Sequence, residues 1–282
     1  MNDSAPNYPP EMNQVGPGVD YEPALMEILA GLNQRKFFFH FQPILALQSG
    51  AQIGSEMLIR WMHRGRILLP ASFFPVIEKH RLIKALDQYV IHEVERMEWE
   101  HAIRPDAPFR VFINVTMESI MDPAFLLPVA EIAQKMKSYG LIPVIELAER
   151  THFYPAVLVD GLESLRGQGV EIALDDFGSG CSSISRLVNL PLDILKIDRH
   201  LTETIGLSER GEAVLESILG LSEKIGMKIV VEGVETQAQA AWLAKQASAC
   251  WVQGYYFGYP QPMEISAPGR DGTARPNQGA GR

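Results

Sequence analysis

Two adjacent carboxylates, Asp175 and Asp176, follow a run of apolar residues and precede two glycines in the stretch IALDDFGSG. Like charges side by side repel each other, and the end of a buried run is an unfavourable place for them. A hard divalent cation removes this repulsion, because Mg²⁺ and Mn²⁺ bind carboxylate oxygens, and one carboxylate can bridge two ions. The pair therefore predicts a site for two ions, Mg²⁺ or Mn²⁺, with further ligands elsewhere in the chain.

Polar residues of the same kind stand at or near the end of other short apolar runs. They are Glu56, Asn114, Glu146, Glu149, Lys196, Asp198, Glu232, Glu235 and Gln253. One acidic residue at a strand end is most often a loop cap, and two aspartates before a glycine are common in turns. The recurrence of the pattern on successive runs favours a metal site. Two metal ions about 3.5–4 Å apart stabilise the attacking and leaving oxygens of a phosphodiester, and Lys196 would steady an anionic oxygen or the attacking water.

The elements that must position these residues are strands alternating with helices, because short apolar runs alternate with amphipathic segments. Strands are expected at residues 37–45, 53–61, 109–115, 143–149, 170–176, 193–198, 227–235 and 249–258. Helices are expected at residues 82–99, 123–140, 154–169, 182–190, 209–226 and 236–247. Only a short turn separates the first two strands, so they must be antiparallel neighbours.

This rhythm is compatible with a closed barrel or with an open doubly wound sheet. No glycine-rich phosphate fingerprint opens a helix near the start of the chain, which disfavours the open dinucleotide-binding sheet. The polar residues at the strand ends favour the barrel, because barrel enzymes carry their active sites at the C-terminal ends of the strands.

The composition of the chain limits which partners and which domain organisation we expect. The 282 residues are 46 % hydrophobic and carry a net charge of −9, which argues against binding to a nucleic-acid polymer. No run of about 18 apolar residues or signal peptide is present, so we expect no membrane span. The two cysteines lack a zinc-binding or disulfide pattern, and the protein is expected in the cytoplasm. We expect a disordered arm at 1–20, one domain at 21–264 and a disordered tail at 265–282.

Nine short motifs in order resemble those of the EAL domains, which hydrolyse the bacterial second messenger cyclic di-GMP. Between residues 34 and 262 the chain contains FQPI (41–44), EML (56–58), IRW (59–61), NVT (114–116), ELAE (146–149), DDFGSGCSS (175–183), LPLDILKID (190–198), VEGVET (231–236) and QGYYFGYP (253–260). The resemblance implies a modified TIM-type (β/α)8 barrel, of class α/β, with one antiparallel strand. It also implies metal-dependent hydrolysis of cyclic di-GMP to linear pGpG, which lowers the messenger level in signalling that controls biofilm formation and motility.

The same resemblance implies roles for individual residues. One ion would be held by Glu56, Asn114, Glu146 and Asp175, and the second by Asp175 and Asp176 with Glu232 close by. Lys196 and Glu232 would orient and activate the water, Glu149 would hold the loop after the fifth strand, and Asp198 and Glu235 would support the site. The dinucleotide would contact Gln42, Leu58, Arg60, Asn114, Asp176 and Gln253. Ca²⁺ would inhibit, because it supports binding without turnover in this family.

Three positions depart from the family pattern: Met57, Ala148 and Cys181 replace alanine, threonine and tyrosine. We expect repacking at Met57, a lost hydrogen bond at Ala148 and altered regulation at Cys181, whose loop couples dimerisation to activity in the family. A homodimer is expected by resemblance. The first 20 residues are too few for a fused sensory domain, so input would come from a regulatory protein partner, from the expression level or from the tails.

Two alternatives remain beside the active enzyme. The first is a catalytically weak or inactive receptor for cyclic di-GMP that regulates other proteins, and the second is another phosphodiesterase on a similar barrel. The complete set of expected ligands favours the enzyme. His40, which lies among apolar residues in FFFHF, is expected to be a hydrogen-bonded strand histidine and not a ligand.

Overall fold

The structure is a computed structural model. It describes residues 14–15, 23–99, 108–147, 155–179, 184–246 and 249–263. Glu149, Ala148 and Cys181 lie outside the described residues, as do the expected C-terminal tail and all of the expected N-terminal arm except residues 14–15. Those two residues, β1 (Gln14–Val15), pair with β4 (Arg66–Leu68).

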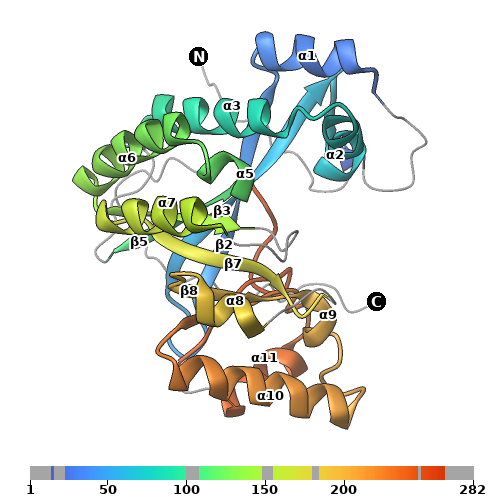
Figure 1. The fold of residues 1–282 in the computed structure, drawn as a ribbon. Coiled ribbons are helices and arrows are strands. Elements are labelled where there is room, and N and C mark those ends of the chain that lie inside the picture. Colours follow the sequence, from blue (N-terminus) through green and yellow to red (C-terminus); the bar gives the residue numbers. More distant parts are fainter. Residues whose placement is uncertain are drawn as a thin grey trace.

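Within the described part of the chain, eight strands close into a barrel (Figure 1). They are β2 (Phe37–Ala46), β3 (Gln52–His63), β5 (Phe109–Val115), β6 (Leu141–Leu147), β7 (Glu171–Phe177), β8 (Ile194–Ile197), β9 (Lys228–Val231) and β10 (Trp251–Val252). The pairing of β3 with β5 closes the ring. β2 is antiparallel to both of its neighbours, β3 and β10, whereas the other pairs in the ring are parallel. The expected barrel with one antiparallel strand is confirmed.

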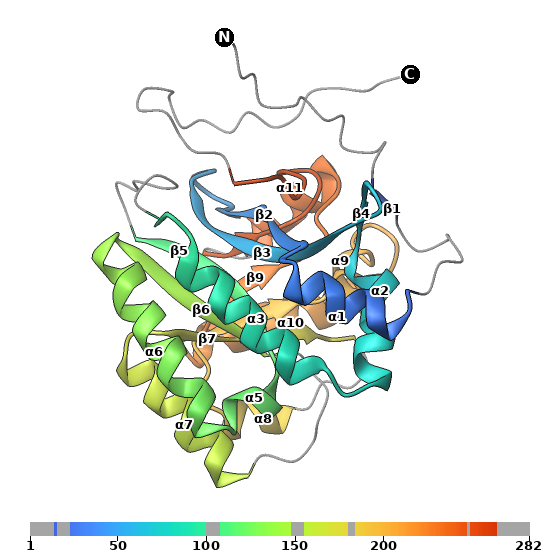
Figure 2. The same cartoon turned by 90° about the horizontal axis from the view of Figure 1, so that it is seen from above.

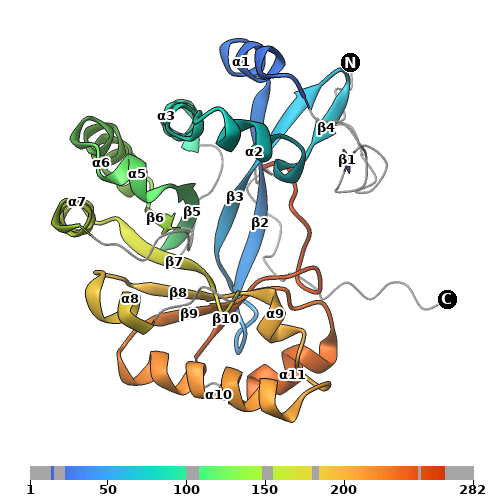
Figure 3. The ribbon, with the colours of Figure 1, turned by 45° about the vertical axis from the view of Figure 1, so that its right-hand side comes forward.

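Helices cover the outside of the barrel. They are α1 (Leu25–Asn33), α2 (Pro70–Lys79), α3 (Ile83–Arg96), α5 (Met117–Ile120), α6 (Pro123–Ser138), α7 (Ala156–Gly167), α8 (Ile184–Asn189), α9 (Arg199–Thr202), α10 (Glu209–Lys224) and α11 (Gln237–Gln246). Figure 2 shows α3, α6 and α7 side by side along one flank, while α10 and α11 cover the strands β8 to β10 on another (Figure 3). The β2–β3 hairpin extends past the ring towards α1 and α2 (Figure 3).

The floor of the barrel is a layer of fully buried apolar side chains that point inward. They are Ile44, Phe112, Val144, Ala173, Ile194 and Val230. Successive side chains of a strand point to opposite faces, so on each strand the residue two positions nearer to the C-terminal ends of the parallel strands also points inward. Those residues are Gln42, Asn114, Glu146, Asp175, Lys196 and Glu232, and the same step from Gly54 and Trp251 leads to Glu56 and Gln253. A polar layer therefore lies directly above an apolar floor.

Two strands are shorter than the sequence indicates. The strand expected at 227–235 ends at Val231, and the one expected at 249–258 is only Trp251–Val252. Gly233 has a φ of +66° and Gly254 a φ of +157°. At these two glycines the chain turns out of the sheet. Glu232 and Gln253 consequently stand at the starts of loops, where they reach over the mouth of the barrel.

Candidate active site

Four carboxylates surround the ammonium group of Lys196, whose side chain is 1 % exposed. The distances from Nζ are 2.6 Å to Glu146, 2.7 Å to Glu232, 3.1 Å to Asp175 and 3.4 Å to Glu56. These residues come from β8, β6, β7, β3 and the end of β9, so segments far apart in the sequence meet at one buried cation. We call Lys196 and these four carboxylates the lysine cluster.

Two amide side chains hold Glu56 in place, and a third, Gln42, is bonded to one of them. Asn114 Nδ2 donates to Glu56 Oε1 at 3.1 Å, and Gln253 Nε2 donates to Glu56 Oε2 at 2.7 Å. Gln253 Nε2 also donates to Gln42 Oε1 at 3.1 Å, and Gln42 Nε2 donates to the carbonyl of Gly258 at 3.3 Å. Because Asn114 donates through its nitrogen, its amide oxygen is left to accept a cation.

Asp176 joins the cluster through an irregularity in β7. Adjacent residues of a regular strand point to opposite faces, but the pairing of β7 with β8 shifts register between Leu174 and Phe177. Asp176 itself has a φ of +56°, a conformation that aspartate tolerates better than most residues. As a result, carboxylate oxygens of Asp175, Asp176 and Glu232 lie within 4.8 Å of one another, a spacing suited to a metal ion.

The pKa values show that one lysine does not balance these acids. Burial, and then the charge of Glu56, raises the pKa of Glu146 well above its usual value. Burial raises the pKa of Glu232 to about 8 against the opposing effect of Lys196, and burial with the charge of Asp175 raises that of Asp176 to about 6. Burial opposes ionisation of Glu56 too, but Lys196 and the amide hydrogen bonds outweigh it, so its pKa is lowered.

Lys196 responds in the opposite sense. Burial by itself lowers its pKa, but the surrounding carboxylates, Asp175 first, raise it well above the usual value of a lysine. The ammonium is therefore charged at any physiological pH. Its single positive charge is smaller than the summed charge of the ionised carboxylates around it.

The residues present fit divalent cations. Glu146 Oε2 is buried and has no hydrogen-bond partner among the described residues, so an acceptor is available at the centre of the site. All the candidate donors are carboxylate or amide oxygens, which suit Mg²⁺ and Mn²⁺ better than zinc. Added positive charge would favour the ionised form of each acid whose pKa is raised.

Comparison with known proteins identifies the family. The family model described as "EAL domain" matches residues 26–260. The chain belongs to the EAL domain family. The probable cyclic di-GMP phosphodiesterase PdeN of Escherichia coli K12 is 30 % identical over 242 residues, which are 84 % of this chain and 46 % of that protein. The cyclic di-GMP phosphodiesterase NbdA of Pseudomonas aeruginosa is 33 % identical over 242 residues, 84 % of this chain and 30 % of that protein.

A solved structure named "PaMucR Phosphodiesterase, c-di-GMP complex" is similar to this EAL domain with a TM-score of 0.74 and 30 % identity. The match covers 84 % of this chain and 97 % of that one. An EAL domain protein from Listeria monocytogenes EGD-e matches with a TM-score of 0.73 and 26 % identity over 86 % of this chain and 96 % of that one. The chain itself spans less than half the length of the two curated relatives named above.

Four further expected site residues of the EAL domain belong neither to the lysine cluster nor to the amides and the aspartate that adjoin it. Asp198 is buried; its Oδ1 accepts from the backbone N–H of His200 at 2.9 Å and also contacts the ring nitrogen of that residue. Leu58 and Arg60 follow Glu56 on the inward face of β3. Glu235 is exposed before α11, where its backbone N–H donates to Gln239, and the structure records no contact of its side chain with the described site residues.

One supporting residue carries no signal in the sequence. Asp87, on α3, is 4 % exposed and accepts hydrogen bonds from Thr116 N, Thr116 Oγ1 and Ser119 Oγ at 3.0, 2.6 and 2.7 Å. Burial raises its pKa in spite of these bonds. Thr116 follows Asn114 by two residues, so Asp87 holds the turn that follows this expected site residue. Within the expected helix 82–99, Asp87 resembles any solvated acid.

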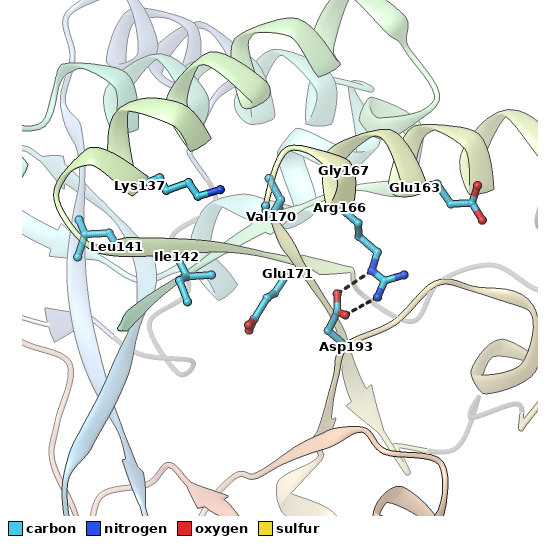
Figure 4. Close-up of a pocket in the computed structure, with 10 residues that line it drawn as sticks. Lys137, Leu141, Ile142, Glu163, Arg166, Gly167, Val170, Glu171 and Asp193 are labelled. Atoms are coloured by element: carbon cyan, nitrogen blue, oxygen red, sulfur yellow. Dashed lines mark hydrogen bonds and ion pairs between the residues drawn. The ribbon is translucent and has the colours of Figure 1, made fainter. Parts of the chain in front are cut away.

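A second hollow, of about 630 Å³, lies at the opposite end of the barrel strands (Figure 4). It borders the starts of β6 and β7 and the ends of α6 and α7, and its acids Glu171 and Asp193 are already paired. Arg166 binds Asp193 through two hydrogen bonds of 2.7 and 3.0 Å, and Glu171 binds Arg110 and Lys228. Because this end of a barrel serves stability and the acids Glu171 and Asp193 are held in ion pairs, the lysine cluster remains the candidate site.

Among the described residues, no helix has both the length and the apolar composition needed to cross a membrane.

Proposed function

We propose that this EAL domain hydrolyses cyclic di-GMP to linear pGpG and uses two divalent cations, Mg²⁺ or Mn²⁺. The observation that carries the proposal is the lysine cluster at the C-terminal mouth of the barrel, where Lys196 contacts four carboxylates and Asp176 adjoins them. Relatives that are named cyclic di-GMP phosphodiesterases, and a similar structure named as a complex with c-di-GMP, support the choice of substrate.

The expected ligands divide into two sets that share one residue. Glu56, Asn114, Glu146 and Asp175 would hold one cation, and Asp175 and Asp176, with Glu232 beside them, would hold the other. When bound, the two cations supply the positive charge that activates water and stabilises the charge developing on the reacting phosphate.

The chain's own residues would orient the water and take its proton. Lys196 Nζ lies 2.7 Å from Glu232 Oε1, so both groups can contact the same water beside them. In the step, the water oxygen forms a bond to phosphorus, its proton passes to the Glu232 carboxylate, and the bond from phosphorus to the 3′ oxygen breaks. The 3′ oxygen takes a proton from solvent. One 5′-phosphate and one free 3′-hydroxyl result, as in pGpG.

The mouth also offers a flat surface for a nucleobase. Tyr255 and Tyr259 are exposed and stack on each other with their ring centroids 4.6 Å apart. They follow Gln253 on a loop that Gly258 ties to β2 through the hydrogen bond from Gln42. Bases stack on exposed aromatic rings with little regard to sequence, so this loop suits a purine dinucleotide.

The test is turnover of cyclic di-GMP by the purified chain with Mg²⁺ or Mn²⁺, followed by chromatography of pGpG. Glu146→Gln keeps the side-chain volume but removes one charge, and we expect it to lower the rate by about 100-fold. Glu163→Gln is the matched control, since Glu163 is exposed at the other end of the barrel. A wild-type protein that binds the nucleotide but never cleaves it would be a receptor, and one that neither binds nor cleaves it would refute both readings.

The remaining proposals extend the resemblance to the whole protein. They are a cytoplasmic homodimer, inhibition by Ca²⁺, a regulatory protein partner and a single domain at residues 21–264 between disordered ends. Light scattering of the purified chain tests the dimer, and limited proteolysis tests the domain limits.

A further inference from the structure

His40 is a buried histidine that the proposed chemistry does not use. It lies on the inward face of β2 between Phe38 and Gln42, is 5 % exposed, and packs edge-on against Phe38 with ring centroids 5.5 Å apart. Its Nδ1 atom has no hydrogen-bond partner among the described residues. The expectation of a hydrogen-bonded strand histidine is therefore wrong at Nδ1.

A second buried polar atom without a partner lies on the neighbouring strand. Arg60 is 5 % exposed, and while its NH1 donates to the carbonyl of Ile59 at 2.9 Å, its Nε has no partner among the described residues. Burial, and then the charge of Arg60, lowers the pKa of His40 to about 4. At neutral pH His40 is therefore an uncharged imidazole, with one nitrogen that donates and one that accepts.

The strand register places both residues on the wall above the lysine cluster. Gln42 pairs with Glu56, His40 with Leu58, and Phe38 with Arg60. At about 3.4 Å per residue, His40 lies one inward step, about 7 Å, beyond the level of Glu56, and Arg60 lies two steps beyond it. Tyr255, whose exposed ring adjoins the mouth, is close enough to Arg60 to influence its pKa. The two residues thus stand above the cluster that would bind the phosphate, and Arg60 is near the ring on which a base would stack.

We propose that His40 is a further ligand-binding residue, which acts with Arg60 to bind the polar edge of a guanine base in a cyclic dinucleotide. This inference rests on the proposed function. Guanine presents the acceptor O6 beside the donor N1–H, whereas adenine presents the donor N6 beside the acceptor N1. The guanidinium supplies the donor for O6, and the neutral imidazole supplies the acceptor for N1–H. An adenine at the same place would meet donor against donor and acceptor against acceptor.

A phosphate is a poorer partner for this pair, because the neutral imidazole brings no positive charge to it. A purely structural role also explains little, since burying a polar atom without a partner lowers stability. Natural proteins keep such atoms where a ligand uses them. The His40→Phe variant separates these possibilities, because it retains a ring next to Phe38 and Leu58 while removing both nitrogens.

The experiment measures binding of cyclic di-GMP and of cyclic di-AMP by calorimetry with Ca²⁺ present, together with thermal unfolding. The proteins are the wild type, His40→Phe, His40→Asn, which restores a polar atom near Nδ1, and the control Phe38→Leu on the same face. We expect His40→Phe to unfold at the same or a higher temperature than the wild type. We also expect it to lower the ratio of the affinity for cyclic di-GMP to that for cyclic di-AMP about tenfold. We expect His40→Asn to recover part of that preference and Phe38→Leu to keep all of it.

An unchanged preference in His40→Phe, or an equal loss for both nucleotides, overturns the role of His40 in reading guanine and leaves the proposed hydrolysis standing. A wild-type protein that binds no cyclic di-GMP overturns the proposed function, and the present inference with it.

Discussion

Lys196→Met tests whether one buried cation holds the acids of the site together. Methionine keeps the length of the side chain but removes the charge that contacts four carboxylates at 2.6 to 3.4 Å. Removing one partner of a buried ion pair costs about 3–5 kcal/mol, because the other charge is left uncompensated. Here the acids can bind protons instead, since the pKa of Glu232 is already about 8 and that of Glu146 is raised. We therefore expect Lys196→Met to lower the free energy of unfolding by about 3 kcal/mol at pH 7.5 in EDTA, the lower end of that range.

The assay is thermal unfolding of the whole chain with and without Mg²⁺. For a domain of this size about 3 kcal/mol corresponds to a fall of about 6–12 °C in Tm. Mg²⁺ bound to the folded state, as proposed, would replace the lost charge and should therefore raise the Tm of the variant more than that of the wild type. Lys137→Met is the control, because Lys137 is exposed at the other end of the barrel, and it should change stability by no more than about 0.5 kcal/mol. Equal Tm values for Lys196→Met and the wild type in EDTA would refute the idea that the lysine balances the acids.

The ion pairs of Glu171, at the start of β7, give a pH-dependent prediction. Burial opposes ionisation of Glu171, but the bonds of 2.8 and 3.0 Å from Arg110 and a further bond from a lysine lower its pKa. The ion pairs of Glu171 therefore stabilise the folded state fully above the unfolded pKa of about 4.3. This stabilisation is lost as the pH falls through the lower pKa that Glu171 has in the folded state. Arg110→Met should lower the free energy of unfolding by about 2 kcal/mol at pH 7 and by much less at pH 3, as measured by urea unfolding. If the variant and the wild type differed by the same free energy at both pH values, the result would contradict this prediction. Gly254→Ala should be strongly destabilising and should weaken binding of cyclic di-GMP, because a Cβ there would lie 2.2 Å from the carbonyl oxygen of Val234. Gly220→Ala, where a Cβ meets nothing within 4 Å in a helix, should instead stabilise by about 0.5–1 kcal/mol, and equal effects of the two alanines would argue against the steric reason.

Local pattern was enough to predict most of the barrel and the inward-facing polar residues that we propose as ligands. An alternating strand turns every second residue inward, so Phe112 followed by Asn114, or Val144 followed by Glu146, already indicates an apolar floor below a polar layer. The short turn between the first two strands likewise required an antiparallel pair, which β2 and β3 confirm.

Other features depend on contacts between segments that the sequence keeps apart. Nothing near Asp87 indicates that it accepts three hydrogen bonds from the turn after Asn114. Asp176 would face away from Asp175 in a regular strand, and only the shifted pairing of β7 with β8 returns it to the site. Glu235, which the motif places with the site residues, is exposed because the chain leaves the sheet at Gly233.

The sequence by itself thus determined which residue types face inward and in what order, because side-chain alternation is a property of each strand alone. Only the tertiary structure decided that Lys196 touches four acids at once and that His40 and Arg60 keep buried polar atoms with no partner in the described part of the chain. The physical reason is that closing the ring sets the stagger between strands, and that stagger determines which inward residues meet across the barrel.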